Sequence, residues 1–566
     1  MPNHLLPLLA FAATPIASTS AQSPSPVGKG KGGNLPPNII YIMSDDHAFQ
    51  AVSAYGHPIG RLAPTPNIDR IAREGVRFDE SFVENSLSSP SRACLITGLY
   101  SHQNGQQMLL EGIDSTRTFF SELLQQAGYE TCMIGKWHLL CEPKGFDRFH
   151  VLYDQGSYWN PEFKSETSGG KYVREEGYAT DLITDHAIEF LDHRDTTKPF
   201  CMLVHHKAPH RSWFPDVKYL GMFDEVEFPM PETMWDDYAT RGSAAHTQKM
   251  SIDKDMELAL DLKVDSVGRP VDRFGQTIAE YGRLNADERK AYERYFGARY
   301  NRFQRDSLTG RALVEWKYQT YLRDYLSVIH SIDENVGRLL RYLDEHGLAD
   351  NTIVVYASDQ GFYLGEHGWF DKRFMYEESL RTPLVMRYPR EIKAGTVSHA
   401  MVQNIDYAPT FLDYAGVKQP KEMTGISLRR VLRSSSKGAN GKSVGRKSLY
   451  YHYYDYPAWH LARKQEGVRT DRYKLIHFYG KGGERALQEN KYQQKQGTRE
   501  NGSYRWMRNS GYITNDPDID YFELYDLQAD PHELNNIYGQ PGTERITRRL
   551  MRLLNGYRKK LQVTEP

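Results

Sequence analysis

Four short apolar runs recur along the chain, and polar residues follow each of them directly. The runs occupy residues 38–43, 131–134, 200–204 and 352–356. They contain many β-branched side chains and do not alternate with polar ones, which is typical of strands buried on both faces. Helical segments separate them. The pattern therefore predicts an α/β fold with a large, mostly parallel central sheet flanked by helices.

An amphipathic helix is predicted just before the last of these runs. Apolar residues recur there every three or four positions, at Leu322, Tyr325, Leu326, Ile329, Val336, Leu339, Leu340 and Leu343. That spacing places them on one face of a helix, and Gly347 is a suitable stop. The preceding residues 281–317 are rich in Lys, Arg, Tyr and Phe. They fit either a solvated helical insert or part of a wall that faces an anionic substrate.

The N-terminal segment has the features of a secretory signal peptide. A short apolar run at residues 5–13 leads to small residues that end at Ala21, so residues 1–21 are expected to be removed on export. The Pro- and Gly-rich residues 22–37 then form a linker. No apolar stretch of the sequence approaches the ~18–20 residues needed to span a bilayer.

The rest of the chain divides at a second low-complexity segment, residues 434–448. We expect residues 38–433 to form the main α/β domain. A Tyr-rich run at residues 450–457 opens the smaller part that follows. Residues 449–566 are expected to form an α+β subdomain with an antiparallel sheet, which completes the substrate cleft.

Composition narrows the function classes without identifying one. In 566 residues, 71 Lys and Arg balance 72 Asp and Glu, for a net charge of -1. This balance argues against a dedicated nucleic-acid binder, which normally carries excess positive charge. The four cysteines, Cys94, Cys132, Cys141 and Cys201, are too few for a disulfide scaffold and match no zinc spacing. Cys132 and Cys141 are the candidates for a disulfide after export.

The residues that follow the four apolar runs are chemically competent. They read Ser44-Asp45-Asp46-His47, Gly135-Lys136-Trp137-His138, His205-His206-Lys207-Ala208-Pro209-His210 and Ala357-Ser358-Asp359-Gln360. Ligands of parallel α/β sheets bind beyond the carboxyl ends of the strands, so these groups are expected to meet at one edge. Carboxylate and amide oxygens are hard ligands, which favour Ca²⁺ or Mg²⁺ over zinc.

The most specific motif is Ser88-Ser89-Pro90-Ser91-Arg92, followed by Thr97-Gly98. Pro and Ser suit the first turn of a helix, but that alone does not explain the spacing. In full, the motif resembles the signature of the formylglycine-dependent sulfatases, in the alkaline-phosphatase-like superfamily, in its Ser form. The resemblance implies that Ser88 is oxidised to formylglycine and that Cys94 is packed on the helix instead.

Further motifs extend the resemblance over most of the chain. They are Thr65-Pro66-Asn67-Ile68-Asp69, Gly135-Lys136-Trp137-His138, His206-Lys207-Ala208-Pro209-His210, Gly365-Glu366-His367-Gly368 with Lys372, and Glu523-Leu524-Tyr525-Asp526-Leu527. The family implies a sulfuric ester hydrolase in which one hydroxyl of the hydrated formylglycine attacks sulfur. The other then expels sulfate from the covalent sulfo-enzyme.

The resemblance also implies a role for each matching residue. Ca²⁺, with Mg²⁺ less favoured, would be held by Asp45, Asp46, Asp359, Gln360 and formylglycine 88. Arg92 would orient the formylglycine, Lys136 and Lys372 would hold the sulfate oxygens, His138 would act as base, and His210 would protonate the leaving oxygen. His205 and His206 compete with His210 for that last role. Gln360 departs from the commoner Asn or His but still offers an amide oxygen.

Ser-type sulfatases resemble one another in needing a radical-SAM maturase before export. The family resemblance therefore implies a bacterial periplasmic or secreted enzyme with that transient partner. The substrate is expected to be a sulfated glycan. By resemblance, residues 365–372 and the C-terminal motifs favour the 6-O-sulfate of N-acetylglucosamine in heparan-type glycosaminoglycans as the substrate. Uronate 2-O-sulfates, other glycosaminoglycan positions and algal galactans stay open.

Candidate sugar contacts are His367, His452, Tyr453, Asp455, His460 and Arg469. Ordinary packing accounts equally well for each of them. Two other function classes also stay open. One is a phosphodiesterase or phosphonate monoester hydrolase of the same superfamily, and the other is a non-catalytic sulfoglycan-binding protein. The sequence does not determine the oligomeric state or distinguish exo from endo action.

Overall fold

The computed structural model describes residues 35–264, 278–437, 444–490, 495–496, 499–500, 507, 509–513 and 516–565. The predicted signal peptide, residues 1–21, lies outside these residues, as does most of the predicted linker 22–37. Within the described part of the chain, no helix is long and apolar enough to cross a membrane.

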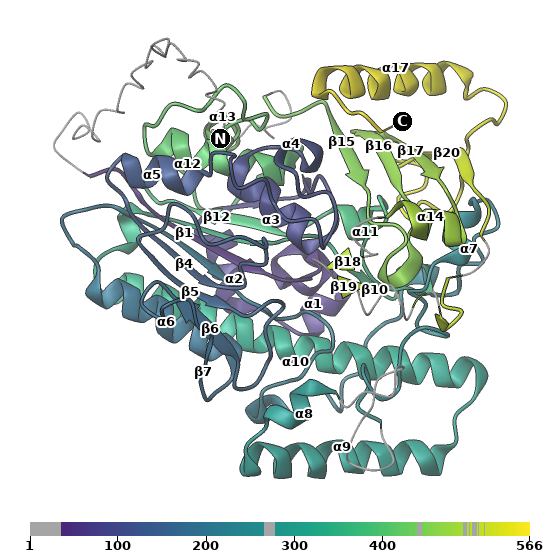
Figure 1. Ribbon diagram of the computed structural model, residues 1–566, viewed down its shortest axis with the longest axis horizontal. Coiled ribbons are helices and arrows are strands. Elements are labelled where there is room, and N and C mark those ends of the chain that lie inside the picture. Colours follow the sequence, from purple (N-terminus) through teal and green to yellow (C-terminus); the bar gives the residue numbers. More distant parts are fainter. Residues whose placement is uncertain are drawn as a thin grey trace, which may run out of the picture.

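A ten-stranded sheet forms the centre of the larger part of the molecule (Figure 1). The four predicted strands are its middle, in the order β9 (Thr352–Ser358), β1 (Asn38–Ser44), β8 (Phe200–His205) and β4 (Glu130–Gly135), and all of these neighbours are parallel. The shorter outer strands are β2 (Val76–Phe78), β5 (Arg148–Leu152), β6 (Glu162–Ser165), β7 (Val173–Arg174), β12 (Leu384–Arg387) and β13 (Thr396–Ser398). The antiparallel pairs described in this sheet are β12–β2, β12–β9, β5–β6 and β6–β7, and each of them includes at least one outer strand. The predicted α/β class and mostly parallel sheet are confirmed.

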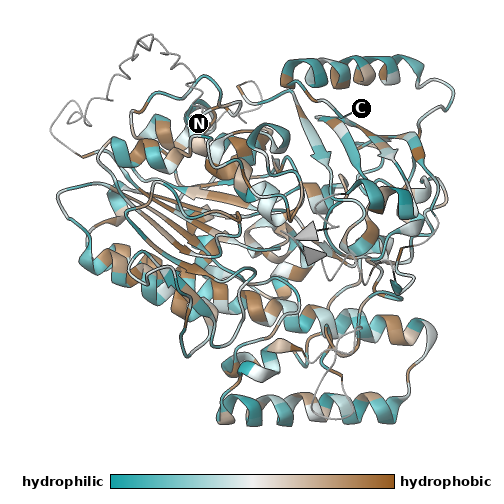
Figure 2. Ribbon diagram, in the orientation of Figure 1, coloured by the Kyte–Doolittle hydropathy of each residue, from teal (hydrophilic) through white to brown (hydrophobic). Residues whose placement is uncertain are grey.

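Helices cover both faces of this sheet, so each central strand is buried on two sides. Along β1, Ile40 and Ile42 pack with α2 (Pro66–Arg73), α6 (Ala179–His193) and α10 (Gly310–Glu345). The alternate residues Ile39 and Tyr41 pack with α3 (Ser88–Thr97), α5 (Phe120–Gln126) and α12 (Tyr407–Tyr414). Figure 2 shows the resulting hydrophobic central strands between amphipathic helices. This explains why the apolar runs do not alternate.

The predicted amphipathic helix is α10, which extends well beyond the predicted region toward its N-terminus. It ends just before Gly347, whose φ of 65° is left-handed. Helices α8 (Ala279–Arg283) and α9 (Ala286–Asp306) precede α10 in the chain and lie beside it in Figure 1. Tyr281, Tyr292 and Phe296 bury one face of this pair in the core. The insert is therefore solvated on its outer face only.

A second sheet follows at the C-terminal side. It has four antiparallel strands in the order β15 (Ser448–Tyr453), β16 (Gln465–Thr470), β17 (Tyr473–Gly480) and β20 (Ile519–Asp526). Helix α17 (Glu544–Leu561) covers it through Leu550, Leu554 and Leu561. The expected α+β subdomain with an antiparallel sheet is confirmed, while the boundaries 38–433, 434–448 and 449–566 stay predictions.

The candidate disulfide is wrong, because all four cysteines are free thiols. Cys132 lies in β4 and packs on the face covered by α6 and α10. Cys141 packs on the opposite face. Neighbouring positions along a loop can thus be separated by the thickness of the sheet, which sequence spacing does not reveal.

Candidate active site at the carboxyl ends of the central strands

The loops that follow β1, β4, β8 and β9 meet at one edge of the central sheet, as predicted. The backbone N–H of Asp45 donates to the carbonyl of Ala208 at 3.1 Å, which joins the β1 and β8 loops. The backbone N–H of Asp46 donates to Oδ1 of Asp359 at 3.1 Å, which joins the β1 and β9 loops. These bonds fix the carboxylates of the β1 and β9 loops beside one another and beside the β8 loop.

Ser88 enters this cluster from the first turn of α3. Its Oγ donates to Oδ1 of Asp45 at 2.9 Å, and the residue is 3% exposed. Leu87, the preceding residue, is extended and provides no side-chain cap. The first N–H groups of the helix and its dipole therefore favour negative charge near Ser88.

Arg92 and Lys136 neutralise one side of the cluster. Nη2 of Arg92 lies 3.0 Å from Oδ2 of Asp359, and its Nη1 donates to the carbonyl of Lys136 at 2.7 Å. The amine of Lys136 bonds to Asp45 and to the amide oxygen of Gln155. Burial opposes the charge on Asp45, but Lys136, His210 and Arg92 hold its pKa well below the usual value. Burial lowers the pKa of Lys136 to about 8.

Lys372 neutralises the other side. Its Nζ lies 2.6 and 2.7 Å from the two carboxylate oxygens of Asp46, and the amide nitrogen of Gln360 donates to the same carboxylate. Burial nevertheless raises the pKa of Asp46 to about 6, against the effect of Lys372. Burial and the charge of Asp45 raise the pKa of Asp359 to about 8. Burial, with a contribution from the charge of Asp45, therefore disfavours the ionised forms of Asp46 and Asp359, whereas Asp45 stays ionised beside its cationic partners.

These residues fit a hard divalent cation. Three carboxylates and one amide supply oxygen ligands at one place, which is the donor set that Ca²⁺ prefers. The carbonyl oxygen of Gln360 is buried and has no hydrogen-bond partner in the described part of the chain. Asp45, Asp46 and His210 offer ligand atoms within 4.8 Å of one another. A bound cation would satisfy the orphaned oxygen and relieve the repulsion between the carboxylates.

Two histidines face this cluster. His210, on the loop after β8, places Nε2 3.9 Å from Oδ2 of Asp46, while its Nδ1 donates to the carbonyl of Arg211 at 2.7 Å. His138 places Nδ1 3.1 Å from Oγ of Ser89 and Nε2 3.5 Å from Oδ1 of Asp154. Burial lowers the pKa of both imidazoles well below the usual value. Both rings are therefore neutral in this state and able to accept a proton.

The competing histidines are placed differently. Nδ1 of His205 lies 3.2 Å from the carbonyl of Lys136, beneath the cluster, and His205 is 2% exposed. His206 is completely buried. The side chain of His210 is 20% exposed. Among the three, His210 alone combines access to solvent with a nitrogen directed at the metal ligands.

The predicted sugar contacts separate into two groups. His460 joins the catalytic cluster, because its Nε2 lies 3.2 Å from Asp371 and 3.4 Å from Nη1 of Arg211. Asp455 lies in the electrostatic surroundings of Arg373, and Tyr453 donates to the Asp455 carbonyl at 2.9 Å. The second group is equally buried but contacts other partners in the fold.

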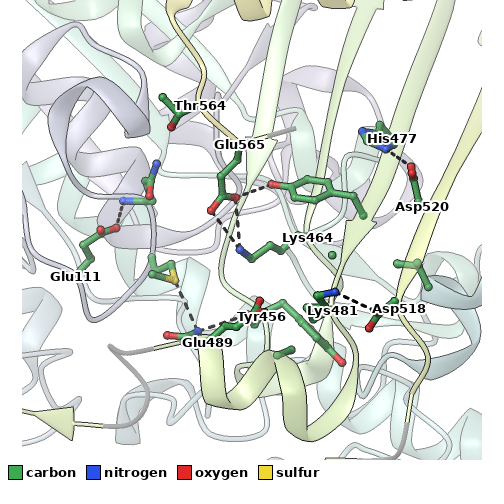
Figure 3. A pocket seen from close by; sticks show the side chains of 17 residues that line it. Glu111, Tyr456, Lys464, His477, Lys481, Glu489, Asp518, Asp520, Thr564 and Glu565 are labelled. Atoms are coloured by element: carbon green, nitrogen blue, oxygen red, sulfur yellow. Dashed lines mark hydrogen bonds and ion pairs between the residues drawn. The ribbon is translucent and has the colours of Figure 1, made fainter.

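That second group consists of His367, His452 and Arg469. His367 is fully buried, 2.9 Å from Asp236. Arg469 pairs with Glu377 at 3.0 Å. Nε2 of His452 lies 2.6 Å from the hydroxyl of Tyr479, and Tyr479 lines a cavity of about 740 Å³ between the C-terminal subdomain and Gln107, Met108 and Glu111 (Figure 3). In that cavity the carboxylate of Glu565 points to the amine of Lys464, and none of the predicted catalytic residues is among its described lining.

Several residues around the site were not predicted from the sequence. They are Asp154 and Gln155, which contact His138 and Lys136, and Arg211, Asp371 and Arg373, which surround His210, Lys372 and His460. Arg211, Asp371 and Arg373 are immediate chain neighbours of motif residues, and that adjacency was an available signal. Asp154 and Gln155 follow β5 and carry no motif. Only the packing of β5 against β4 brings them to the site.

Comparison with known proteins agrees with this geometry. Residues 37–417 match the Sulfatase family model, and residues 365–504 and 508–560 match the model of the N-sulphoglucosamine sulphohydrolase C-terminal region. An N-acetylglucosamine-6-O-sulfatase of Bacteroides thetaiotaomicron is 45% identical over 94% of this chain and 88% of the relative. An N-acetylglucosamine-6-sulfatase of Capra hircus is 25% identical over 90% of this chain and 81% of its own length.

A solved structure gives the same picture. The structure of BT4656 in complex with its substrate D-glucosamine-2-N,6-O-disulfate superposes with a TM-score of 0.83 at 45% identity, and covers 94% of this chain and 99% of that one. The predicted family resemblance is therefore confirmed over nearly the whole chain. With the Ser88 motif and the convergent carboxylates, lysines and histidines in one place, this protein belongs to the sulfatase family and is a sulfuric ester hydrolase.

Proposed function

We propose that this sulfatase removes the 6-O-sulfate from N-acetylglucosamine or N-sulfoglucosamine residues of heparan-type glycosaminoglycans. The observation that carries the proposal is the 45% identity over 94% of the chain to an N-acetylglucosamine-6-O-sulfatase. The complex of BT4656 with a 6-O-sulfated glucosamine, at the same identity, supports it. No comparable observation favours a phosphodiesterase, a phosphonate monoester hydrolase or a non-catalytic glycan-binding protein.

The proposed cofactors are Ca²⁺ and a formylglycine made from Ser88. Asp45, Asp46, Asp359 and Gln360 would hold the cation together with residue 88. When present, the cation would supply positive charge and the hydrated aldehyde would supply the nucleophilic hydroxyl. The 2.9 Å contact between Ser88 Oγ and Asp45 supports the assignment of residue 88 to the proposed ligands.

The side chains of the site then divide the remaining work. Lys136 and Lys372, on opposite sides of the carboxylates, are placed to bind sulfate oxygens and stabilise charge as it develops there. His210 is proposed to take up a proton from solvent at Nε2 and to pass it to the leaving sugar oxygen, because its Nδ1–H is committed to the carbonyl of Arg211 and the side chain is 20% exposed. His138 is proposed to act as base beside residue 88, and Arg92 to hold Asp359 and the loop of Lys136 in place.

Sugar recognition is proposed for the polar group beside Lys372. Asp371 lies 3.0 Å from Nε of Arg373 and 3.2 Å from Nε2 of His460. Burial raises the pKa of Asp371, but the charges of these partners outweigh that effect and hold the pKa well below its usual value. An ionised carboxylate and a guanidinium side by side suit the bidentate recognition of vicinal hydroxyls. His460 and Asp455 are therefore the favoured members of the predicted sugar contacts.

We also propose a bacterial, exported enzyme, periplasmic or secreted, that a radical-SAM maturase modifies before export. The Ser form of the motif and the bacterial relative at 45% identity support this. Co-expression with and without the maturase, followed by mass spectrometry of the peptide that contains Ser88, tests the modification. Complete formylglycine without the maturase would exclude that partner.

The substrate assignment is tested with matured protein on a panel of defined sugars. The panel contains glucosamine carrying 6-O-, 3-O- or N-sulfate, galactosamine 6-O-sulfate, and a disaccharide with uronate 2-O-sulfate, each followed by chromatography. The proposal expects desulfation of the glucosamine 6-O-sulfates, and none by the Ser88→Ala protein. Preference for the uronate or galactosamine sulfate would refute the substrate. Full activity of the Ser88→Ala protein would refute the mechanism.

A further inference from the structure

Three ligand-type side chains meet at the outer edge of the central sheet, away from the active site. His150 lies in β5, Glu175 directly follows β7, and His186 lies in α6, all at the edge where Figure 1 labels these elements together. Nε2 of His150 is 2.7 Å from Oε1 of Glu175, and Nε2 of His186 is 2.7 Å from Oε2. One carboxylate thus faces two imidazoles from separate elements.

The geometry of these three groups is close to that of a metal site. One ligand atom from each lies within 4.8 Å of the others. Tetrahedral coordination with bonds of about 2.0–2.2 Å separates neighbouring ligand atoms by about 3.4 Å. Moving from 2.7 Å contacts to that separation takes only small side-chain rotations. The side chains of His150, Glu175 and His186 are 24%, 26% and 19% exposed, so a fourth position is open to water.

The surroundings also orient the two rings. Nδ1 of His186 lies 3.4 Å from Oε2 of Glu189, an acceptor that holds a proton on Nδ1, while Nε2 donates to Glu175 in this state and would release its proton when a metal binds there. Metal-bound histidines commonly have such a carboxylate behind them. Phe163 of β6 packs against both rings, at centroid distances of 4.8 and 5.4 Å. This apolar contact covers one side of the group and leaves the other to solvent.

We propose that His150, Glu175 and His186 form a second metal site, which takes a transition metal of the zinc class. Two imidazole nitrogens and one carboxylate suit Zn²⁺, whereas Ca²⁺ prefers the all-oxygen set of the active site. Glu175 presents its two carboxylate oxygens to Nε2 of His150 and Nε2 of His186, so the three groups already converge on one point.

A metal at this position would join three segments of the outer sheet edge. β5, the chain after β7 and α6 are separate elements within residues 148–193, and the short outer strands have few ladder bonds of their own. Because the metal binds the folded arrangement and not the unfolded chain, its binding should raise the melting temperature. The proposal concerns no residue of the active site, so the sulfatase activity of the variants below should stay unchanged.

The test uses the untagged full-length chain, stripped of metals and then held in excess Ca²⁺ to occupy hard-oxygen sites. Zn²⁺ is added, and binding is followed by calorimetry, by the visible absorption of Co²⁺ in its place, and by the melting temperature. We expect one equivalent of Zn²⁺ that Ca²⁺ does not displace, a tetrahedral Co²⁺ spectrum and a rise in melting temperature. His186→Ala and Glu175→Gln should each weaken this binding at least tenfold.

His193→Ala provides the matched control, because His193 is exposed on the same helix and, in the described contacts, its side chain bonds only to the carbonyl of Glu189. This variant should bind Zn²⁺ as the original chain does. The proposal fails if the original chain binds no Zn²⁺ equivalent under excess Ca²⁺. It also fails if Glu175→Gln, which is nearly isosteric and should fold, binds Zn²⁺ with unchanged affinity. Active-site failure is separate, since it would appear as lost desulfation without a change in this binding.

Discussion

His210→Ala should distinguish substrates by the quality of their leaving group. In the structure, Nδ1–H of His210 is bound to the Arg211 carbonyl, so Nε2 is the nitrogen that faces the site. A positioned acid typically contributes about 10²–10⁴ in rate. Because the side chain is 20% exposed, water can reach the vacated position and replace part of that effect. We therefore expect a loss of about 10²–10³ in kcat on a glucosamine 6-O-sulfate, or about 3–4 kcal/mol.

An aryl sulfate such as 4-nitrophenyl sulfate provides the comparison. Its phenolate leaves without protonation, so the His210→Ala variant should lose less than about tenfold on it. Lys372→Ala serves as the matched control, because Lys372 faces the sulfate site and not the leaving group. It should lose activity on both substrates to a similar extent. Equal losses of the His210→Ala variant on both substrates would refute the acid role, even if both losses were large.

Three further predictions rest on other parts of the structure. In the metal-free protein, the pKa values of the Asp46 and Asp359 carboxyls are raised from 3.8 to about 6 and about 8. The folded protein therefore binds these two protons more tightly than the unfolded chain does. Protonation of these carboxyls therefore stabilises the fold at low pH, and this contribution is lost as the pH rises through those values. Because Ca²⁺ competes with the protons, it should raise the melting temperature more at pH 8 than at pH 5, and an equal or smaller increase at pH 8 would contradict this. Asp324→Asn should destabilise the fold by about 3–5 kcal/mol, because it leaves Arg299 and Lys263 buried beside a neutral group, and thermal unfolding that matches the original chain would contradict it. Finally, thiol titration of the denatured, non-reduced protein should give four free cysteines, and a count of two would restore the discarded disulfide.

Much of the active site follows from sequence because its residues lie where strands end. Asp45, Lys136, His210 and Asp359 each come within a few residues of a buried apolar run, and parallel pairing then brings them to one edge. Ser88 is recognisable from its motif, and the motif also predicts the helix that begins there. The physical basis is short-range in each case: strand periodicity and helix-start chemistry are local properties of the chain.

The sugar contacts show where such local reasoning ends. His367, His452 and Arg469 have the side chains that glycan recognition uses, yet each is buried in a network of ion pairs or hydrogen bonds inside the fold. Their chemistry is the same in either place. Burial depends on which elements pack together, and residues such as Gln155 reach Lys136 only through that packing.

The sequence by itself determined the α/β class, the meeting of the loops after the four central strands at one sheet edge, and the family. It also supplied the residues that we propose for the metal and sulfate sites. Those properties are written in spacing along the chain. Only the tertiary structure decided that Cys132 and Cys141 lie on opposite faces of a sheet, and that Asp371 and Arg373 accompany His460. It alone also brought His150, Glu175 and His186 together. Such arrangements involve residues of separate elements, and the distances between them are set by how helices and strands pack, which no local pattern encodes.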